Sequence, residues 1–61
     1  RYFVRATAEP ADVEAAFGAV SYVTAEGVSG ETAFVTEEMD EYAYEAAAEK
    51  LGGVLQRIRV R

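Results

Sequence analysis

The residues of this chain that are best suited to chemistry are arginines and aromatic side chains at alternate positions near its two ends. The 61-residue sequence has no histidine and no cysteine, which excludes imidazole and thiol catalysis, disulfides and the usual zinc ligands. All five arginines occupy odd positions: Arg1, Arg5, Arg57, Arg59 and Arg61. Odd positions of a β-strand share one face, so each terminal strand presents its arginines together. Arginines among exposed aromatic rings are typical of a surface that binds nucleic acid, although the solvated side of a small sheet has the same composition.

Acidic and hydroxyl residues do not have the spacing of a catalytic or metal site. The densest acidic cluster is Glu37, Glu38, Asp40 and Glu41, which lacks the alternating ligands of a calcium loop. Its position favours interaction with the exposed N–H groups at a helix start. Neither serine has a histidine to activate it. We therefore predict a binding protein that is not an enzyme and uses no metal and no cofactor.

Charge is distributed unevenly along the chain. The net charge of −5 argues against a generic nucleic-acid binder, because phosphate neutralisation dominates non-specific affinity. The acids concentrate in two helical segments, whereas all basic residues except Lys50 lie on predicted strands. A hydrophobic content of 51% favours a folded chain, and no apolar run approaches the length of a membrane span. We expect a soluble protein of the cytoplasm or another intracellular compartment, with no membrane partner.

Apolar periodicity and turn residues predict six elements. Pro10 suits the first turn of a helix, Gly18 and Gly52 suit helix ends, and Thr36 is the expected cap of the second helix. The expected order is a strand over 1–8, a helix over 10–17, a strand over 20–25, a turn over 27–30, a strand over 31–36, a helix to about Leu51 and a strand over 54–61.

This order predicts an α/β (α+β) fold, a single ferredoxin-like βαββαβ sandwich over residues 1–61. Right-handed connections favour a four-stranded antiparallel sheet with both helices on one face and the terminal strands adjacent. The arginines then form one cluster that borders Phe3 and Phe34 on the open face. The expected core consists mostly of small residues: Val4, Ala6, Val13, Phe17, Ala33, Val35, Ala43, Ala47, Leu51, Ile58 and Val60.

Over nearly its whole length the chain resembles an RNA recognition motif domain. Tyr2-Phe3-Val4 is similar to the aromatic hexapeptide of that family's first strand, and the segment 30–35 is similar to its third-strand octapeptide. The sequence departs from the family at Thr32 and Glu37, where aromatic residues are usual, so it resembles a degenerate member. The resemblance implies a partner that is single-stranded RNA or a protein segment, with Phe3 and Phe34 as stacking residues. The implied RNA-binding set is Phe3, Arg5, Thr32, Phe34, Arg57 and Arg59.

A second resemblance, to the ACT regulatory domain of the homoserine dehydrogenase type, uses the same order of elements. Phe34-Val35-Thr36 and Ile58-Arg59-Val60 are similar to strands of that domain, and Ala8-Glu9-Pro10-Ala11 takes the place of its effector loop. The family has a Pro-Gly pair there, whereas this chain has Pro10-Ala11. The resemblance implies an amino-acid effector bound by Glu9, Pro10, Ala11 and Ser21. A homodimer, and a structural or designed ferredoxin-like domain without a ligand, are further alternatives.

Overall fold

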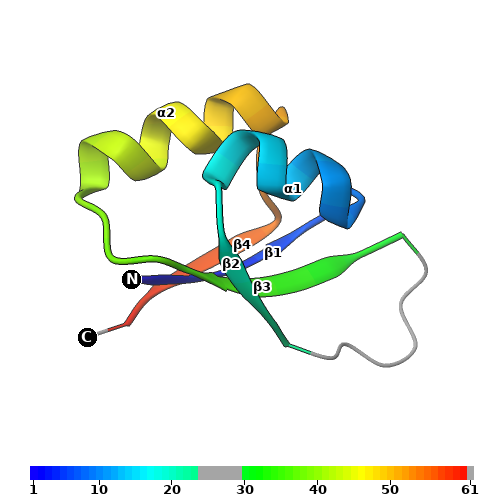
Figure 1. Ribbon diagram of the computed structural model, residues 1–61, viewed down its shortest axis with the longest axis horizontal. Helices are drawn as coiled ribbons and strands as arrows, with labels where there is room; N and C mark the ends of the chain where they lie inside the picture. The colour runs from blue at the N-terminus through cyan, green and yellow to red at the C-terminus, as the bar shows by residue number, and fades with distance from the viewer. Residues whose placement is uncertain (24–29, 61) are drawn as a thin grey trace.

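The protein is a two-layer sandwich of one antiparallel sheet and two helices. The structure is a computed structural model and describes residues 1–23 and 30–60. The elements are β1 (Tyr2–Ala6), α1 (Pro10–Phe17), β2 (Val20–Val23), β3 (Thr32–Thr36), α2 (Glu41–Leu51) and β4 (Gln56–Arg59). The strands follow the order β2-β3-β1-β4 and every neighbouring pair is antiparallel. Both helices lie on one side of the sheet (Figure 1). The predicted ferredoxin-like fold is therefore confirmed.

The helix boundaries follow from residues that satisfy free backbone groups. α1 has Pro10 in its first turn and ends at Gly18, whose φ of 82° places it in a region that side chains disfavour. The residue that caps the start of α2 is Asp40, whose carboxylate accepts a hydrogen bond from the Ala43 N–H at 2.7 Å. The helix ends at Gly52 in the left-handed conformation.

Thr36 does not cap α2, so this prediction was wrong. Thr36 lies within β3, four residues before the capping position, and its buried hydroxyl performs a different task. The Thr36 Oγ1 accepts a hydrogen bond from the Tyr2 N–H at 3.0 Å and donates one to the Glu37 carbonyl at 2.8 Å. It therefore links the end of β3 to the start of β1.

Aromatic rings fill the space between the sheet and the helices. Tyr2 stacks on Tyr44 with ring centroids 4.4 Å apart, and Phe17 meets Phe34 edge-on at 5.1 Å. Val4, Val13 and Ala47 complete the buried cluster around these rings. A core that otherwise consists of alanine and valine needs these rings to reach a native packing density.

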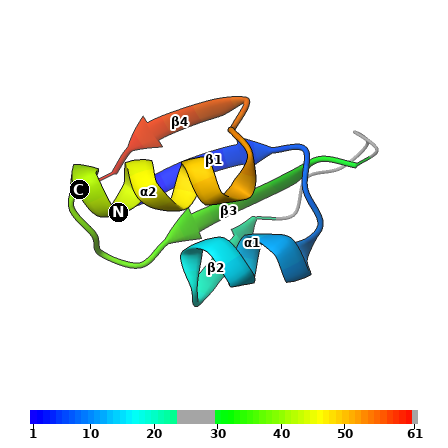
Figure 2. The ribbon, with the colours of Figure 1, turned by 90° about the horizontal axis from the view of Figure 1, so that it is seen from above.

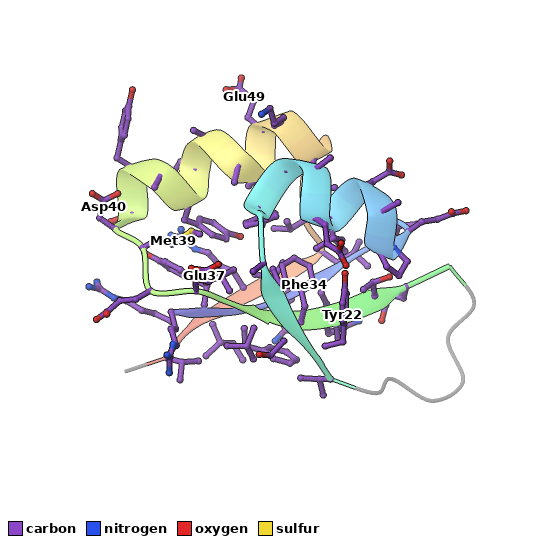
Figure 3. The ribbon with its side chains drawn as sticks, in the orientation of Figure 1. Tyr22, Phe34, Glu37, Met39, Asp40 and Glu49 are labelled. Carbon is purple, nitrogen blue, oxygen red and sulfur yellow. The ribbon has the colours of Figure 1, made fainter. Side chains whose placement is uncertain are left out.

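The assignment of sheet faces was right for β1 and wrong for β3 and β4. Opposite residues in antiparallel strands share a face, and Val4 pairs with Phe34 on one side and with Arg57 on the other. Phe34 therefore faces the helices with 0% of its surface exposed (Figure 3), whereas Ile58 lies on the open face and is 49% exposed. The register, which alternation within one strand does not reveal, decides the face.

The predicted core residues differ in how deeply they are buried. Buried as expected are Val4, Ala6, Val13, Phe17, Ala33 and Ala47. Leu51 and Val35 are half-buried, and Ala43, Ile58 and Val60 are exposed. Three predictions lie outside the described residues: the end of the second strand at 24–25, the turn at 27–29, and Arg61.

Candidate functional site

The open face of the sheet presents apolar side chains from all four strands. Phe3 lies at its centre, because it pairs with Val35 of β3 on one side and with Ile58 of β4 on the other. Val23 of β2 is 43% exposed on the same face, beyond Ala33. Val60 continues this face past the end of β4 and is also exposed. No helix covers these residues, since both helices pack on the other side (Figure 1).

At one end of this face, a cation and an anion neutralise each other. Arg5 contacts the carboxylate of Glu31 through Nε and Nη2, both at 3.2 Å, and also donates a hydrogen bond to Gln56. This bidentate pair fixes the guanidinium in a defined orientation. Three of the five N–H donors of Arg5 thereby lie in existing hydrogen bonds. The charge available on this face is small.

The arginines of β4 lie on the opposite face from Phe3 and Arg5, which corrects the predicted arginine cluster. Arg57 forms ion pairs with Glu41 at 3.6 Å and Glu45 at 3.3 Å on α2. Its guanidinium also lies over the rings of Tyr2 and Tyr44, at 5.9 and 5.2 Å from their centroids. Arg57 thus packs against the edge of the core and is not available to the open face.

Two members of the predicted RNA-binding set, Phe3 and Arg5, lie on the open face, and four do not. Phe34 belongs to the core, and Arg57 and Arg59 lie on the helix side. Thr32 shares that side, where its hydroxyl donates a hydrogen bond to the Ala8 carbonyl. The sequence alone did not predict that the open face carries Val23, Val35, Ile58 and Val60. A signal existed for β3 in the size of the Phe34 ring, because a core that otherwise consists of alanine and valine needs large rings to reach a native packing density.

The predicted effector-binding residues are separated by the sheet. Glu9 is the first residue before α1, and Pro10 and Ala11 form its first turn. Ser21 pairs with Val35 and therefore lies on the open face, in the other layer from α1. Next to the effector loop, however, a shallow cavity of about 490 Å³ is lined by Thr7, Ala8, Asp12, Ala15, Ala16, Lys50 and Leu51.

A tyrosine on the edge strand β2 has an altered acidity. Tyr22 donates a hydrogen bond to the Glu14 carboxylate of α1 and lies 3.3 Å from the Pro10 carbonyl (Figure 3). The hydrogen bond to Glu14 raises the pKa of Tyr22 to about 12. Tyr22 is 44% exposed, and its contact with α1 accounts for this shift.

Within residues 1–23 and 30–60, no group of three or more acidic, histidine or cysteine side chains is arranged to hold a metal ion. In the same part of the chain, no helix has the length and apolar character needed to cross a membrane. Comparisons of the sequence and fold with family models, curated proteins and solved structures found no match.

Proposed function

We propose that this domain is a non-catalytic binding module whose open sheet face binds an apolar protein surface, which in the isolated chain is a second copy. The observation that carries the proposal is the uncovered apolar face formed by Phe3, Val23, Val35, Ile58 and Val60. Exposed apolar patches that span several strands mark interaction surfaces in small proteins. Association removes these side chains from water and stabilises the complex in proportion to the area buried.

Charge favours a protein partner over RNA on this face. Phosphate binding needs free cations, but the Arg5 guanidinium is paired with Glu31, and Arg57 is paired with two glutamates on the other side of the sheet. Phe3 is the only aromatic ring left on the open face among the described residues, since Phe34 is buried. Single-stranded RNA would therefore find one stacking ring and few phosphate contacts.

The size of the face sets the expected strength of self-association. The molecule measures 30 × 23 × 18 Å, and the layers stack along the intermediate axis (Figure 1). The sheet itself is smaller, because four strands of four or five residues, at about 3.3 Å per residue and about 4.8 Å between strands, cover roughly 15 × 19 Å. Two such faces bury on the order of 600 Å², less than the roughly 1,000 Å² of a specific interface, so we expect a weak dimer with a dissociation constant toward the millimolar range.

Analytical ultracentrifugation over a range of concentrations tests the proposal. We expect a reversible monomer–dimer equilibrium that Ile58→Lys abolishes, because the lysine would bring a charge into the buried face. Tyr42→Lys is the matched control: it removes an exposed apolar side chain from α2 and should leave the equilibrium unchanged. A chain that stays monomeric at millimolar concentration, or a dimer that Ile58→Lys does not weaken, would contradict the proposal.

A parallel titration with RNA tests whether the open face binds RNA instead of protein. Short single-stranded RNA added to isotopically labelled protein should leave the amide signals of Phe3 and Arg5 unchanged if the face binds protein. Shifts at these two residues, with strong weakening by salt, would instead support the RNA interpretation.

A second candidate function, binding of a free amino acid, is favoured by the cavity beside the effector loop. Asp12 and Lys50 both line it, and their opposite charges complement the ammonium and carboxylate groups of an amino acid. If such a ligand binds, millimolar threonine or serine should stabilise the protein by about 2.7 kcal/mol at a hundredfold excess over Kd. Lys50→Glu should remove this rise in melting temperature. No rise with any common amino acid would exclude this candidate.

A further inference from the structure

The ion pair between Arg5 and Glu31 lies at one end of the open face, next to the ring of Phe3. Figure 2 shows the end of β1 beside the start of β3 and the start of β4, where Arg5, Glu31 and Gln56 meet. Phe3 and Arg5 are two positions apart in β1, so their side chains are neighbours on the same face. The pair therefore controls the charge beside the aromatic ring of this face.

The guanidinium of Arg5 uses both carboxylate oxygens of Glu31. Its Nε donates to Oε1 and its Nη2 donates to Oε2, both at 3.2 Å, while Nη1 donates to Gln56. The Glu31 side chain is only 12% exposed, whereas that of Arg5 is 40% exposed. The planar fork of an arginine matches a phosphate in the same way as it matches a carboxylate. Glu31 thus occupies the position on Arg5 that a phosphate would take.

The other arginines of the sheet are not placed to act in the same way beside Phe3. Arg57 and Arg59 lie on the helix side, and Arg1 lies at the opposite end of β1. A free guanidinium next to an accessible ring is the combination that single-stranded nucleic acid binds, through a phosphate contact and base stacking. The open face contains both groups, but the guanidinium is already paired. Whether this face accepts a polyanion is therefore decided at Glu31.

We propose that Glu31 is a specificity-determining residue of the open face: by holding Arg5 in an ion pair, it excludes single-stranded nucleic acid and leaves the face to an apolar protein partner. Specific surfaces commonly disfavour the wrong partner in addition to fitting the right one. The identity of the remaining partner rests on the proposed function, whereas the exclusion of nucleic acid rests on the ion pair alone.

Glu31→Gln tests this proposal, because glutamine keeps the size of the side chain and leaves the charge of Arg5 unbalanced. Short single-stranded RNA is titrated into isotopically labelled protein at a concentration at which the protein is monomeric. The variant should bind RNA about two- to fivefold more tightly than the wild type, the range of one exposed ion pair. Its affinity should fall more steeply with salt, by about 0.7 in the log–log slope for one added phosphate contact. The amide signals of Phe3 and Arg5 should shift in the variant only.

Glu49→Gln is the matched control, because it changes the net charge by the same amount on α2, where Glu49 projects away from the sheet (Figure 3). It should bind RNA as weakly as the wild type does. Arg5→Gln combined with Glu31→Gln should remove the gain, since the gain acts through the guanidinium. Circular dichroism of each variant checks that the fold is retained.

Equal RNA affinities of the Glu31→Gln and Glu49→Gln variants would overturn the proposal. So would a gain that persists when Arg5 is also replaced, or wild-type binding at Phe3 and Arg5 that is as tight as in the variant. A chain that stays monomeric in ultracentrifugation would contradict the proposed self-association instead. It would not alter the RNA result, because the titration is carried out on the monomer.

Discussion

The two faces of the sheet have nearly the same apolar content and opposite surroundings. The covered face places Tyr2, Val4 and Phe34 beneath the helices, whereas the open face places Phe3 and Ile58 in contact with water. A sheet that needed only to be soluble would be apolar on one face and polar on the other. Here the second face is also apolar, and its exposure to water is unfavourable in free energy unless another surface covers it. This difference is the physical basis of the proposed binding role.

The largest expected effect comes from exchanging one ring on each face for alanine. Phe34→Ala should cost about 3–5 kcal/mol, because it leaves a cavity among Val4, Phe17 and Tyr44. A domain of this size has about 3–9 kcal/mol of total stability, so this variant should be largely unfolded. Phe3→Ala should cost about 1 kcal/mol, since Phe3 is already partly hydrated. Urea denaturation measures both, and equal costs would remove the distinction between the faces.

A second pair of variants compares the stability contributed by two threonine hydroxyls on the covered face. Thr36→Val should cost about 1–3 kcal/mol, because the Tyr2 N–H loses its acceptor inside the protein. Thr32→Val should cost about 1 kcal/mol or less, because Thr32 is only partly buried. Thermal denaturation gives both values. A larger loss at Thr32 than at Thr36 would contradict the assigned hydrogen bonds.

The helix α2 helps to cover one face of the sheet, and its capping residue should contribute measurably to the free energy of unfolding. Asp40→Ala should destabilise the protein by about 1 kcal/mol through loss of the bond to the Ala43 N–H. Asp40→Asn keeps an acceptor and should restore most of this stability in chemical denaturation. If asparagine were as harmful as alanine, the negative charge and not the hydrogen bond would be the stabilising feature.

The smallest effect is expected at high pH, at the margin of the covered face. The folded pKa of Tyr22, about 12, lies above the ordinary tyrosine value of 10.0, so the fold favours the neutral phenol. This contribution to stability is present below pH 10 and is lost as the pH rises toward 12. Tyr22→Phe should flatten that part of the stability profile. Ultraviolet titration of tyrosinate, compared between the two proteins, measures the pKa, and an ordinary value for Tyr22 would contradict the bond to Glu14.

The element order and three of the four helix ends were predictable from local signals, whereas the start of α2 was not. Pro10, Gly18 and Gly52 mark helix boundaries through their backbone preferences, which do not depend on the rest of the chain. The alternation of β1 also gave its buried face correctly. These features depend on neighbouring residues only, so a single sequence is sufficient to predict them.

The composition of the open face was not predictable in the same way. In β3, both the set with Phe34 and the set with Ala33 and Val35 are compatible with a core, and in β4 the apolar Ile58 is the natural choice for burial. Pairing across strands decides otherwise, and the register is a tertiary property. Arg57 reaches the helix side because two glutamates of α2 and two tyrosine rings receive it there. None of these partners is near Arg57 in the sequence.

Solvent accessibility of the two phenylalanine rings tests the central claim most directly. A soluble nitroxide added to the protein broadens the NMR signals of ring protons that contact solvent. Under conditions where the protein is monomeric, we expect the Phe3 ring signals to broaden and those of Phe34 to remain sharp. Broadening of Phe34 with protection of Phe3 would show that the faces are reversed, and the apolar binding surface described here would not exist.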